Sequence, residues 1–200
     1  MLKFNEVAKK YNSKYAVKNI NLTIEPSNIY LFIGENGSGK STTIKLISKV
    51  IFTSEYNIFE NKFKKIIYLP DKRNYPKLLT TFDFLKYYLN VKTDIINDYL
   101  LKYDLPNKSI GSLSKGNIQK LGILQILLSE GDLYLLDEPT DGLDKNSINL
   151  LIEDLKKMLS NNKTIIISTH KKTIYNELHP IIYKFETGTC NETKRKRKIN

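Results

Sequence analysis

The sequence predicts an α/β protein in which a mostly parallel sheet is flanked by helices. Short apolar runs alternate with helical patterns from residue 29 to residue 183, and strands separated by helices form parallel sheets that are covered on both faces. The chain has 200 residues, of which 40% are hydrophobic and 26% charged, which suits a single globular domain with its own core. A glycine-rich loop joins the first fully apolar run directly to a helix.

The expected elements begin with two different kinds of strand. Residues 18–24 alternate between polar and apolar side chains, which predicts a half-buried strand in a small amino-terminal antiparallel β part. Residues 29–33 are continuously apolar and predict a strand that is buried on both faces. The helix after the glycine-rich loop is expected to bury Ile44, Leu46, Ile47 and Val50.

The rest of the chain continues the alternation with one interruption. Further strands are expected over residues 66–69, 133–136, 164–168 and 181–183. Further helices are expected over residues 81–89, 94–103, 114–129 and 146–159, with a short helix before residue 181. Residues 79–113 place two helices in succession with no strand between them, so we interpret this block as a helical subdomain inserted into the α/β domain.

Charge and composition limit the function classes. The formal net charge is +11, and a run of five basic residues at 194–198 supplies almost half of it. We assign residues 1–190 to the domain and residues 191–200 to a basic tail. A solvated, disordered tail is the favoured interpretation. An anionic membrane face is a second. A nucleic-acid partner is not expected.

The location of the chain is expected to be cytoplasmic. No run approaches the roughly 18 consecutive apolar residues that a membrane-spanning helix needs, and the amino terminus has no apolar segment of the kind found in secretory signals. Cys190 is the only cysteine, so we expect no internal disulfide and an incidental thiol near the tail.

The glycine-rich loop carries the strongest motif. Residues 34–41 read GENGSGKS and fit the P-loop pattern G-x-x-x-x-G-K-[ST], between a strand and a helix as the motif requires. Its glycines let successive backbone N–H groups turn toward one anion, and the helix N-terminus favours negative charge. The predicted nucleotide-binding residues here are Gly34, Asn36, Gly37, Ser38, Gly39, Lys40, Ser41 and Thr42. Lys40 is expected at the β- and γ-phosphates, and the Ser41 hydroxyl on Mg²⁺.

A second motif supplies carboxylates. The apolar run 133–136 ends in Asp137 and Glu138, and ligands gather at the carboxyl ends of parallel strands. Asp137 is expected to hold Mg²⁺, and Glu138 is expected to act as the general base toward water. Acidic residues also occur before helix N-termini for electrostatic reasons alone, but the P-loop favours the catalytic interpretation.

With these motifs in place, the chain resembles the nucleotide-binding domains of ABC transporters over almost its whole length. Residues 113–117 (LSKGN) resemble the family signature, and residues 139–144 (PTDGLD) resemble the D-loop. Ser168-Thr169-His170 resembles the H-switch, Tyr11 the aromatic residue that stacks on adenine, and Asp71 occupies the Q-loop position. The expected fold is therefore a P-loop NTPase with an inserted helical subdomain.

The resemblance implies ATP and Mg²⁺ as ligands and a head-to-tail dimer with ATP between one subunit's P-loop and the other's signature. Ser114, Gly116 and Asp144 would then contact nucleotide across the interface, Asp71 would be a further Mg²⁺ ligand, and Glu138 and His170 would be catalytic. Two bland alternatives stay open, because Ser114 and Asp144 could simply cap the helices that follow them. Whether the dimer is a homodimer or a heterodimer also stays open.

The resemblance further implies transmembrane subunits as partners and a position at the inner face of the membrane. The pattern looks most like bacterial exporters of peptide, drug or lipid-like substrates. Lys115 and Asn117 depart from the usual signature residues, and Asp71 replaces a glutamine. The stretch between residues 50 and 66 is short for the family, which suggests a reduced antiparallel part. The alternative function is a non-transport ABC ATPase acting on nucleic acid or a macromolecular assembly.

Overall fold

The structure is a computed structural model that describes residues 1–193. Its main sheet has six strands in the order β5-β6-β7-β3-β8-β9. These strands are β3 (Ile29–Ile33), β5 (Ile66–Leu69), β6 (Leu133–Asp137), β7 (Thr164–Thr169), β8 (Ile181–Glu186) and β9 (Thr189–Thr193). All neighbouring pairs are parallel except β8 and β9, which confirms the predicted mostly parallel sheet.

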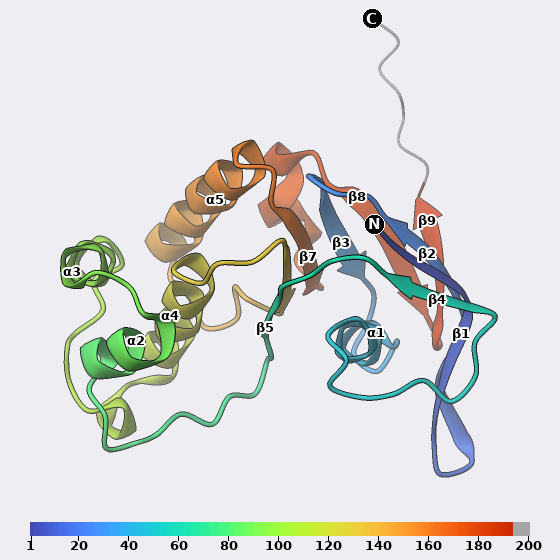
Figure 1. The fold of residues 1–200 in the computed structure, drawn as a ribbon, viewed down its shortest axis with the longest axis horizontal. Coiled ribbons are helices and arrows are strands. Elements are labelled where there is room, and N and C mark those ends of the chain that lie inside the picture. The colour runs from blue at the N-terminus through green and yellow to red at the C-terminus, as the bar shows by residue number, and fades with distance from the viewer. Residues whose placement is uncertain (194–200) are drawn as a thin grey trace, which may run out of the picture.

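A smaller antiparallel sheet lies at the amino-terminal end, as predicted (Figure 1). It contains β2 (Lys14–Ile24), β1 (Leu2–Tyr11) and β4 (Ile58–Asn61), with β1 in the middle. The sequence analysis missed β1, β4 and β9. In β1 the alternation is broken by register shifts between Phe4 and Lys10, so the period of two that marks a strand is lost there.

Helices cover the main sheet on both faces. The helix α1 (Lys40–Ile47) lies between the two sheets, and its Ile44, Leu46 and Ile47 share one core with both of them. On the opposite face α2 (Thr81–Leu89), α3 (Thr93–Lys102), α4 (Lys115–Leu127) and α5 (Lys145–Ser160) enclose a second core, with short 3₁₀ segments at Ile110–Ser112 and Lys172–Leu178. In β7, Ile166 points into the first core while Ile165 and Ile167 point into the second, as the period of two requires.

The helices α2 and α3 form a lobe to one side of the main sheet, and α4 leads back to the sheet (Figure 1). A buried ion pair ties the lobe to α5. Asp154, only 3% exposed, accepts hydrogen bonds from Lys102 Nζ at 2.5 and 2.7 Å and from Tyr103 Oη at 2.9 Å. The carboxylate therefore bridges the end of α3 and the middle of α5.

Three expectations need correction. The helix α1 ends at Ile47, and Lys49 has a left-handed φ of 60°, so Val50 is 60% exposed and not part of the helix's buried face. Cys190 lies buried inside β9, not in a loose segment, and burial raises the pKa of its thiol to about 11. Residues 191–193 belong to β9 and not to the tail. The basic run 194–198 lies outside the described residues.

Candidate nucleotide-binding site

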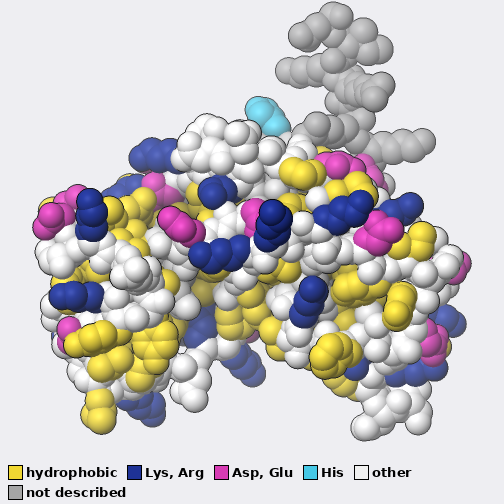
Figure 2. All heavy atoms as spheres, in the orientation of Figure 1, with side chains coloured by type: hydrophobic (Ala, Val, Ile, Leu, Met, Phe, Trp, Pro, Cys, Tyr) yellow, Lys and Arg dark blue, Asp and Glu magenta, His cyan; other side chains and the backbone are white. Residues whose placement is uncertain are grey.

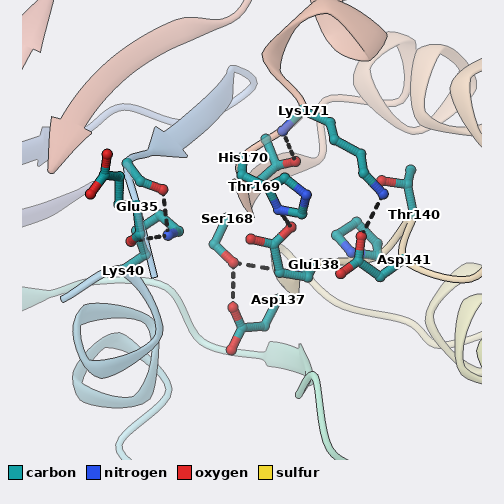
Figure 3. Close-up of polar contacts among 12 residues, drawn as sticks. Glu35, Lys40, Asp137, Glu138, Thr140, Asp141, Ser168, Thr169, His170 and Lys171 are labelled. Atoms are coloured by element: carbon teal, nitrogen blue, oxygen red, sulfur yellow. Dashed lines mark hydrogen bonds and ion pairs between the residues drawn. The ribbon is translucent and has the colours of Figure 1, made fainter. Parts of the chain in front are cut away.

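The P-loop forms the connection from β3 to α1. Gly39 precedes α1 with φ 107°, and a Cβ at this position would lie 2.5 Å from Val17 Cγ1. Only glycine fits, because both the backbone conformation and the contact with β2 exclude a side chain. Lys40 Nζ donates hydrogen bonds to the carbonyl oxygens of Gly34 at 2.8 Å and Glu35 at 2.9 Å (Figure 3). The loop thus curls around the lysine ammonium group.

The interior of this loop suits an anion. Lys40 is 5% exposed, and both hydrogen bonds given above for its ammonium group go to neutral carbonyl oxygens. Ser38 Oγ is buried and has no hydrogen-bond partner among the described residues. A buried cation and an unsatisfied hydroxyl at a helix N-terminus are favourable surroundings for phosphate. The residues present therefore fit the phosphates of a nucleotide.

Three side chains with oxygen atoms meet beside the loop. Ser41 Oγ donates to Asp137 Oδ1 at 3.0 Å. Ser168 Oγ also donates to Asp137 Oδ1 (Figure 3). Asp137 is 2% exposed at the carboxyl end of β6. A hydroxyl and a carboxylate in contact at the P-loop form a donor set that suits Mg²⁺.

Glu138 stands next to this pair in an unusual backbone conformation. Its φ is 46°, in the left-handed region that is uncommon for residues other than glycine. Its N–H donates to the carbonyl oxygen of Ser168 at 3.1 Å and to the Ser168 hydroxyl oxygen at 3.3 Å (Figure 3). Its Oε2 lies 3.2 Å from His170 Nδ1 (Figure 3). Burial raises the pKa of the Glu138 carboxyl group, and His170 partly opposes that shift. A half-buried carboxylate with a raised pKa is a candidate general base.

The D-loop region is held from a neighbouring element. Lys171 Nζ lies 2.7 Å from Asp141 Oδ1. Ligand atoms of Glu138, Asp141 and His170 lie within 4.8 Å of one another, but Asp141 is already paired with Lys171. This cluster belongs to the hydrolytic end of the site, and we assign no separate metal to it.

A cavity of about 480 Å³ joins these features. Its lining includes Asn36, Gly37, Ser38, Gly39, Lys40, Ser41, Thr42, Asp71 and Glu138. The structure thus brings the predicted phosphate-binding residues, the Q-loop aspartate and the candidate base to one place. Gly34 lies behind the loop, where an added Cβ would be 2.7 Å from Ser38 Oγ.

The cavity also contains residues that sequence reasoning missed. Tyr15 and Ala16 from β2 line it, together with Thr187 and Gly188 from the turn between β8 and β9. Gly188 N–H donates to the carbonyl oxygen of Ser38 at 3.1 Å. No local motif marks that turn, because its role depends on the pairing of β8 with β3, which is distant in sequence.

Tyr11 is not brought into the cavity. It ends β1, is 47% exposed, and has the Lys9 ammonium group 5.4 Å from its ring centroid. Tyr15, across the same hairpin, lines the cavity and donates through its hydroxyl to Glu55 Oε2 at 3.1 Å. The hairpin therefore carries two tyrosines, and the structure places the second of them at the cavity mouth.

The signature residues lie apart from the cavity. Ser114 caps α4 by accepting a hydrogen bond from Asn117 N–H at 3.2 Å, and Asp144 caps α5 by accepting one from Ser147 N–H at 2.8 Å. Gly116 abuts the D-loop, where an added Cβ would lie 3.1 Å from the Gly142 carbonyl oxygen. None of these three predicted site residues lines the cavity. Within one chain, Ser114 and Asp144 therefore act as helix caps.

The fold and the site together define a P-loop nucleoside triphosphatase. Residues 17–141 match the sequence model of the ABC transporter family. This match spans more than half of the chain, so the protein belongs to the ABC transporter family as an ATP-binding subunit, and its ATPase fold is the one predicted.

Individual relatives agree. A lantibiotic transport ATP-binding protein of Streptococcus pyogenes is 33% identical over 85% of this chain and 80% of its own length. A zinc import ATP-binding protein of Wigglesworthia glossinidia brevipalpis is 32% identical over 90% of this chain and 78% of its own length. Among solved structures, a dimeric ATP-binding cassette bound to ADP and Pi matches with TM-score 0.82 and 25% identity, covering 97% of this chain and 98% of that one.

No helix among residues 1–193 is both long and apolar enough to cross a membrane.

Proposed function

We propose that this chain hydrolyses ATP to power transport, in the export direction, through separate membrane subunits. The observation that carries the proposal is the division of the chain into a nucleotide cavity and a helical lobe with exposed apolar side chains. In that lobe and the loop before it, Leu78 is 95% exposed and Tyr87 75% exposed, with Tyr88 and Leu101 also exposed. Hydrophobic side chains gather over the end of the molecule where α2 lies (Figure 2). Such a patch is typical of a protein-interaction surface.

The export direction rests on the relatives and on the motif pattern. The lantibiotic transport protein is named above, and a cytochrome c biogenesis ATP-binding export protein of Reclinomonas americana is 32% identical over 80% of each chain. The zinc import relative shows that identity alone does not separate the directions. The proposed substrates are peptides, drugs or lipid-like molecules, and the chain would lie at the inner face of the membrane, held by its partner.

In the proposed mechanism the P-loop binds the phosphates of ATP through backbone N–H groups and Lys40. Ser41 and Asp137 would hold Mg²⁺, with Asp71 near enough to line the same cavity. The ion, when bound, neutralises phosphate charge. Glu138 orients a water and accepts its proton at the carboxylate, while His170 holds the carboxylate in place.

The proposed site is completed by a second cassette. Ser114 and Gly116 lie at the N-terminus of α4, where N–H groups of the first turn and the helix dipole favour an anion. Neither residue lines the nucleotide cavity of residues 1–193, so they would contact nucleotide held by another cassette, either a copy of this chain or a different ATPase subunit.

Site-specific photo-cross-linking tests the transporter assignment. A benzophenone amino acid at position 78 should cross-link to an integral membrane protein in cells that express the chain with its chromosomal neighbours. The same amino acid at Lys157, which is exposed on α5, is the matched control and should not. Cross-links from position 78 exclusively to ribosomes, nucleic-acid complexes or other soluble assemblies would contradict the proposal and favour a non-transport ATPase.

A further inference from the structure

A half-buried arginine lies outside the nucleotide cavity, two residues after Asp71. Arg73 Nε donates to the carbonyl oxygen of Pro70 at 2.7 Å, and its Nη1 donates to Gln119 Oε1 at 2.9 Å. Its Nη2 is buried without a hydrogen-bond partner among the described residues, and burial lowers the pKa of the guanidinium group. Arg73 lies between α4 and the segment that follows β5, residues 70–75, called here the Asp71 loop. Because removing an arginine from water is costly, we expect this buried position to serve a function.

Gln119 extends this contact to the hydrolytic end of the site. It is 7% exposed on α4, and its Nε2 donates to the carbonyl oxygens of Pro139 at 2.6 Å and Glu138 at 3.3 Å. The two ends of one amide group thus hold Arg73 on one side and the Glu138 turn on the other. The same helix begins at Ser114, so the bridge joins three elements of the site.

A glycine on α4 makes room for the guanidinium group. A Cβ at Gly122 would lie 2.8 Å from Arg73 Nη1 and 2.9 Å from Leu69 Cδ1. Any larger residue would have to push the arginine or the end of β5 away. Since glycine inside a helix is destabilising relative to alanine, its presence here fits a need for close approach.

We propose that Arg73 is a positioning residue that holds the Glu138 turn in its reactive geometry through Gln119. The proposal rests on the proposed function, in which Glu138 accepts the proton of the attacking water. Glu138 needs such support because its backbone is in the left-handed region, which persists only where neighbouring groups hold it. A displacement of the Asp71 loop is then transmitted to the Glu138 backbone through two hydrogen bonds.

Steady-state ATP hydrolysis by the full chain tests the proposal. Arg73→Met keeps an unbranched stem of similar bulk to the aliphatic part of arginine and removes the donors, so kcat should fall about tenfold or more, because small displacements of catalytic groups are costly. The KM for ATP should change little, since Arg73 does not line the nucleotide cavity. The acid limb of the kcat–pH profile should also move, because the environment of the Glu138 carboxyl group changes. Gln119→Ala should lower kcat to a similar extent. The double variant Arg73→Met with Gln119→Ala should have a kcat no lower than that of either single variant.

Tyr75→Phe is the matched control. Tyr75 Oη donates to Gln125 Oε1 at 2.9 Å, so it joins the same loop to the same helix without reaching the Glu138 turn. It should leave kcat and its pH profile unchanged. Equal losses of kcat in Arg73→Met and Tyr75→Phe, or additive losses in the Arg73 and Gln119 double variant, would overturn the proposal.

Two further variants keep the outcome decisive. Should Arg73→Met fail to fold, Gly122→Ala displaces the guanidinium group while keeping its charge, and an unchanged kcat in that variant overturns the proposal. Glu138→Gln is measured in parallel. Retained hydrolysis in Glu138→Gln would contradict the proposed role of Glu138 itself, whereas lost hydrolysis there with normal kcat in Arg73→Met would overturn only the role of Arg73.

Discussion

Two regions of the chain differ in whether they form a site on their own: the region around the P-loop and the end of β6, called here the nucleotide half, and the region around the start of α4, called here the signature half. In the nucleotide half, the start of α1 and the end of β6 come together. Lys40, Ser41 and Glu138 line one cavity, and Ser41 Oγ donates to Asp137 Oδ1. In the signature half, Ser114 caps α4 and Gly116 lies in its first turn, and neither residue lines the nucleotide cavity. In the proposed function, one half carries the reacting groups and the other carries groups that would bind the phosphates of nucleotide held by a second cassette. The difference supports the proposal that a functional site takes one half from each of two cassettes. One solved relative is a dimeric ATP-binding cassette bound to ADP and Pi.

The largest expected effect lies in the nucleotide half. Glu138→Gln removes the general base, so the hydrolysis rate should fall about 10²- to 10⁴-fold while ATP still binds. Phosphate release measures the rate, and fluorescence of a labelled nucleotide measures binding. Asp141→Asn is the control, because Asp141 pairs with Lys171 beside the site and should lose far less. A fall smaller than that of the control would contradict the role assigned to Glu138.

The next largest expected effect concerns the contact that attaches the helical lobe to α5. Asp154→Ala leaves Lys102 and Tyr103 without their shared acceptor, and removing one member of a buried pair costs about 3 kcal/mol or more. Urea denaturation should show this loss in the free energy of unfolding. Asp154→Asn keeps part of the hydrogen bonding and should lose less. Equal stability of all three proteins would mean that the bridge does not hold the helical lobe to α5.

Mixing experiments test whether the halves complement one another. Ser114→Asp keeps a good helix cap but places a negative charge toward phosphate, so it separates the capping role from nucleotide binding. Ser114→Asp and Lys40→Ala should each be inactive alone. Mixed in equal amounts, they should recover roughly a quarter of the wild-type rate, since half of the dimers carry one intact site out of two.

The control for that experiment places both defects in the nucleotide half. Lys40→Ala mixed with Glu138→Gln leaves every composite site defective, so no activity should return. No recovery in the Ser114→Asp and Lys40→Ala mixture, or normal activity of Ser114→Asp alone, would contradict a site shared between two chains. Recovery in the control would contradict the placement of Lys40 and Glu138 in the same half.

The smallest expected effect concerns pH. Burial raises the pKa of Glu138, and only its deprotonated form is a base, so hydrolysis should fall as pH drops through that raised pKa. For stability the sign is opposite: the folded state holds this proton more tightly, so its contribution is present at low pH and is lost as pH rises through the folded pKa. Glu138→Gln should therefore have a higher Tm than the wild type at neutral pH, with the difference vanishing in acid.

The sequence allowed prediction of the parallel sheet, the P-loop and the carboxylates of β6, because each depends on a short run of residues. The apolar run of β3 and the motif that follows are both local signals. The end of α1 was harder to predict from the sequence. The chain turns away after the helix through a left-handed backbone conformation at Lys49, where the sequence has no glycine to indicate it. The strand β1 was missed because its register shifts hide the alternation.

The long-range parts of the site could not be predicted. Tyr15 and Gly188 reach the cavity only because β2 and the β8–β9 turn are brought against the P-loop by the fold. The contact between Arg73 and Gln119 joins residues 46 positions apart. Spacing alone pointed to Tyr11, whose ring lies at the far side of the hairpin turn from the residue that lines the cavity.

The mass of the Glu138→Gln protein in solution tests the central claim most directly. Light scattering is measured with and without Mg-ATP, because removal of the base should trap the ATP-bound state. The account predicts that the mass doubles with nucleotide and that Lys40→Ala or Ser114→Asp, introduced into the same background, abolishes the doubling. A protein that stays monomeric at saturating ATP would contradict the claim that two copies of this chain complete each other's sites.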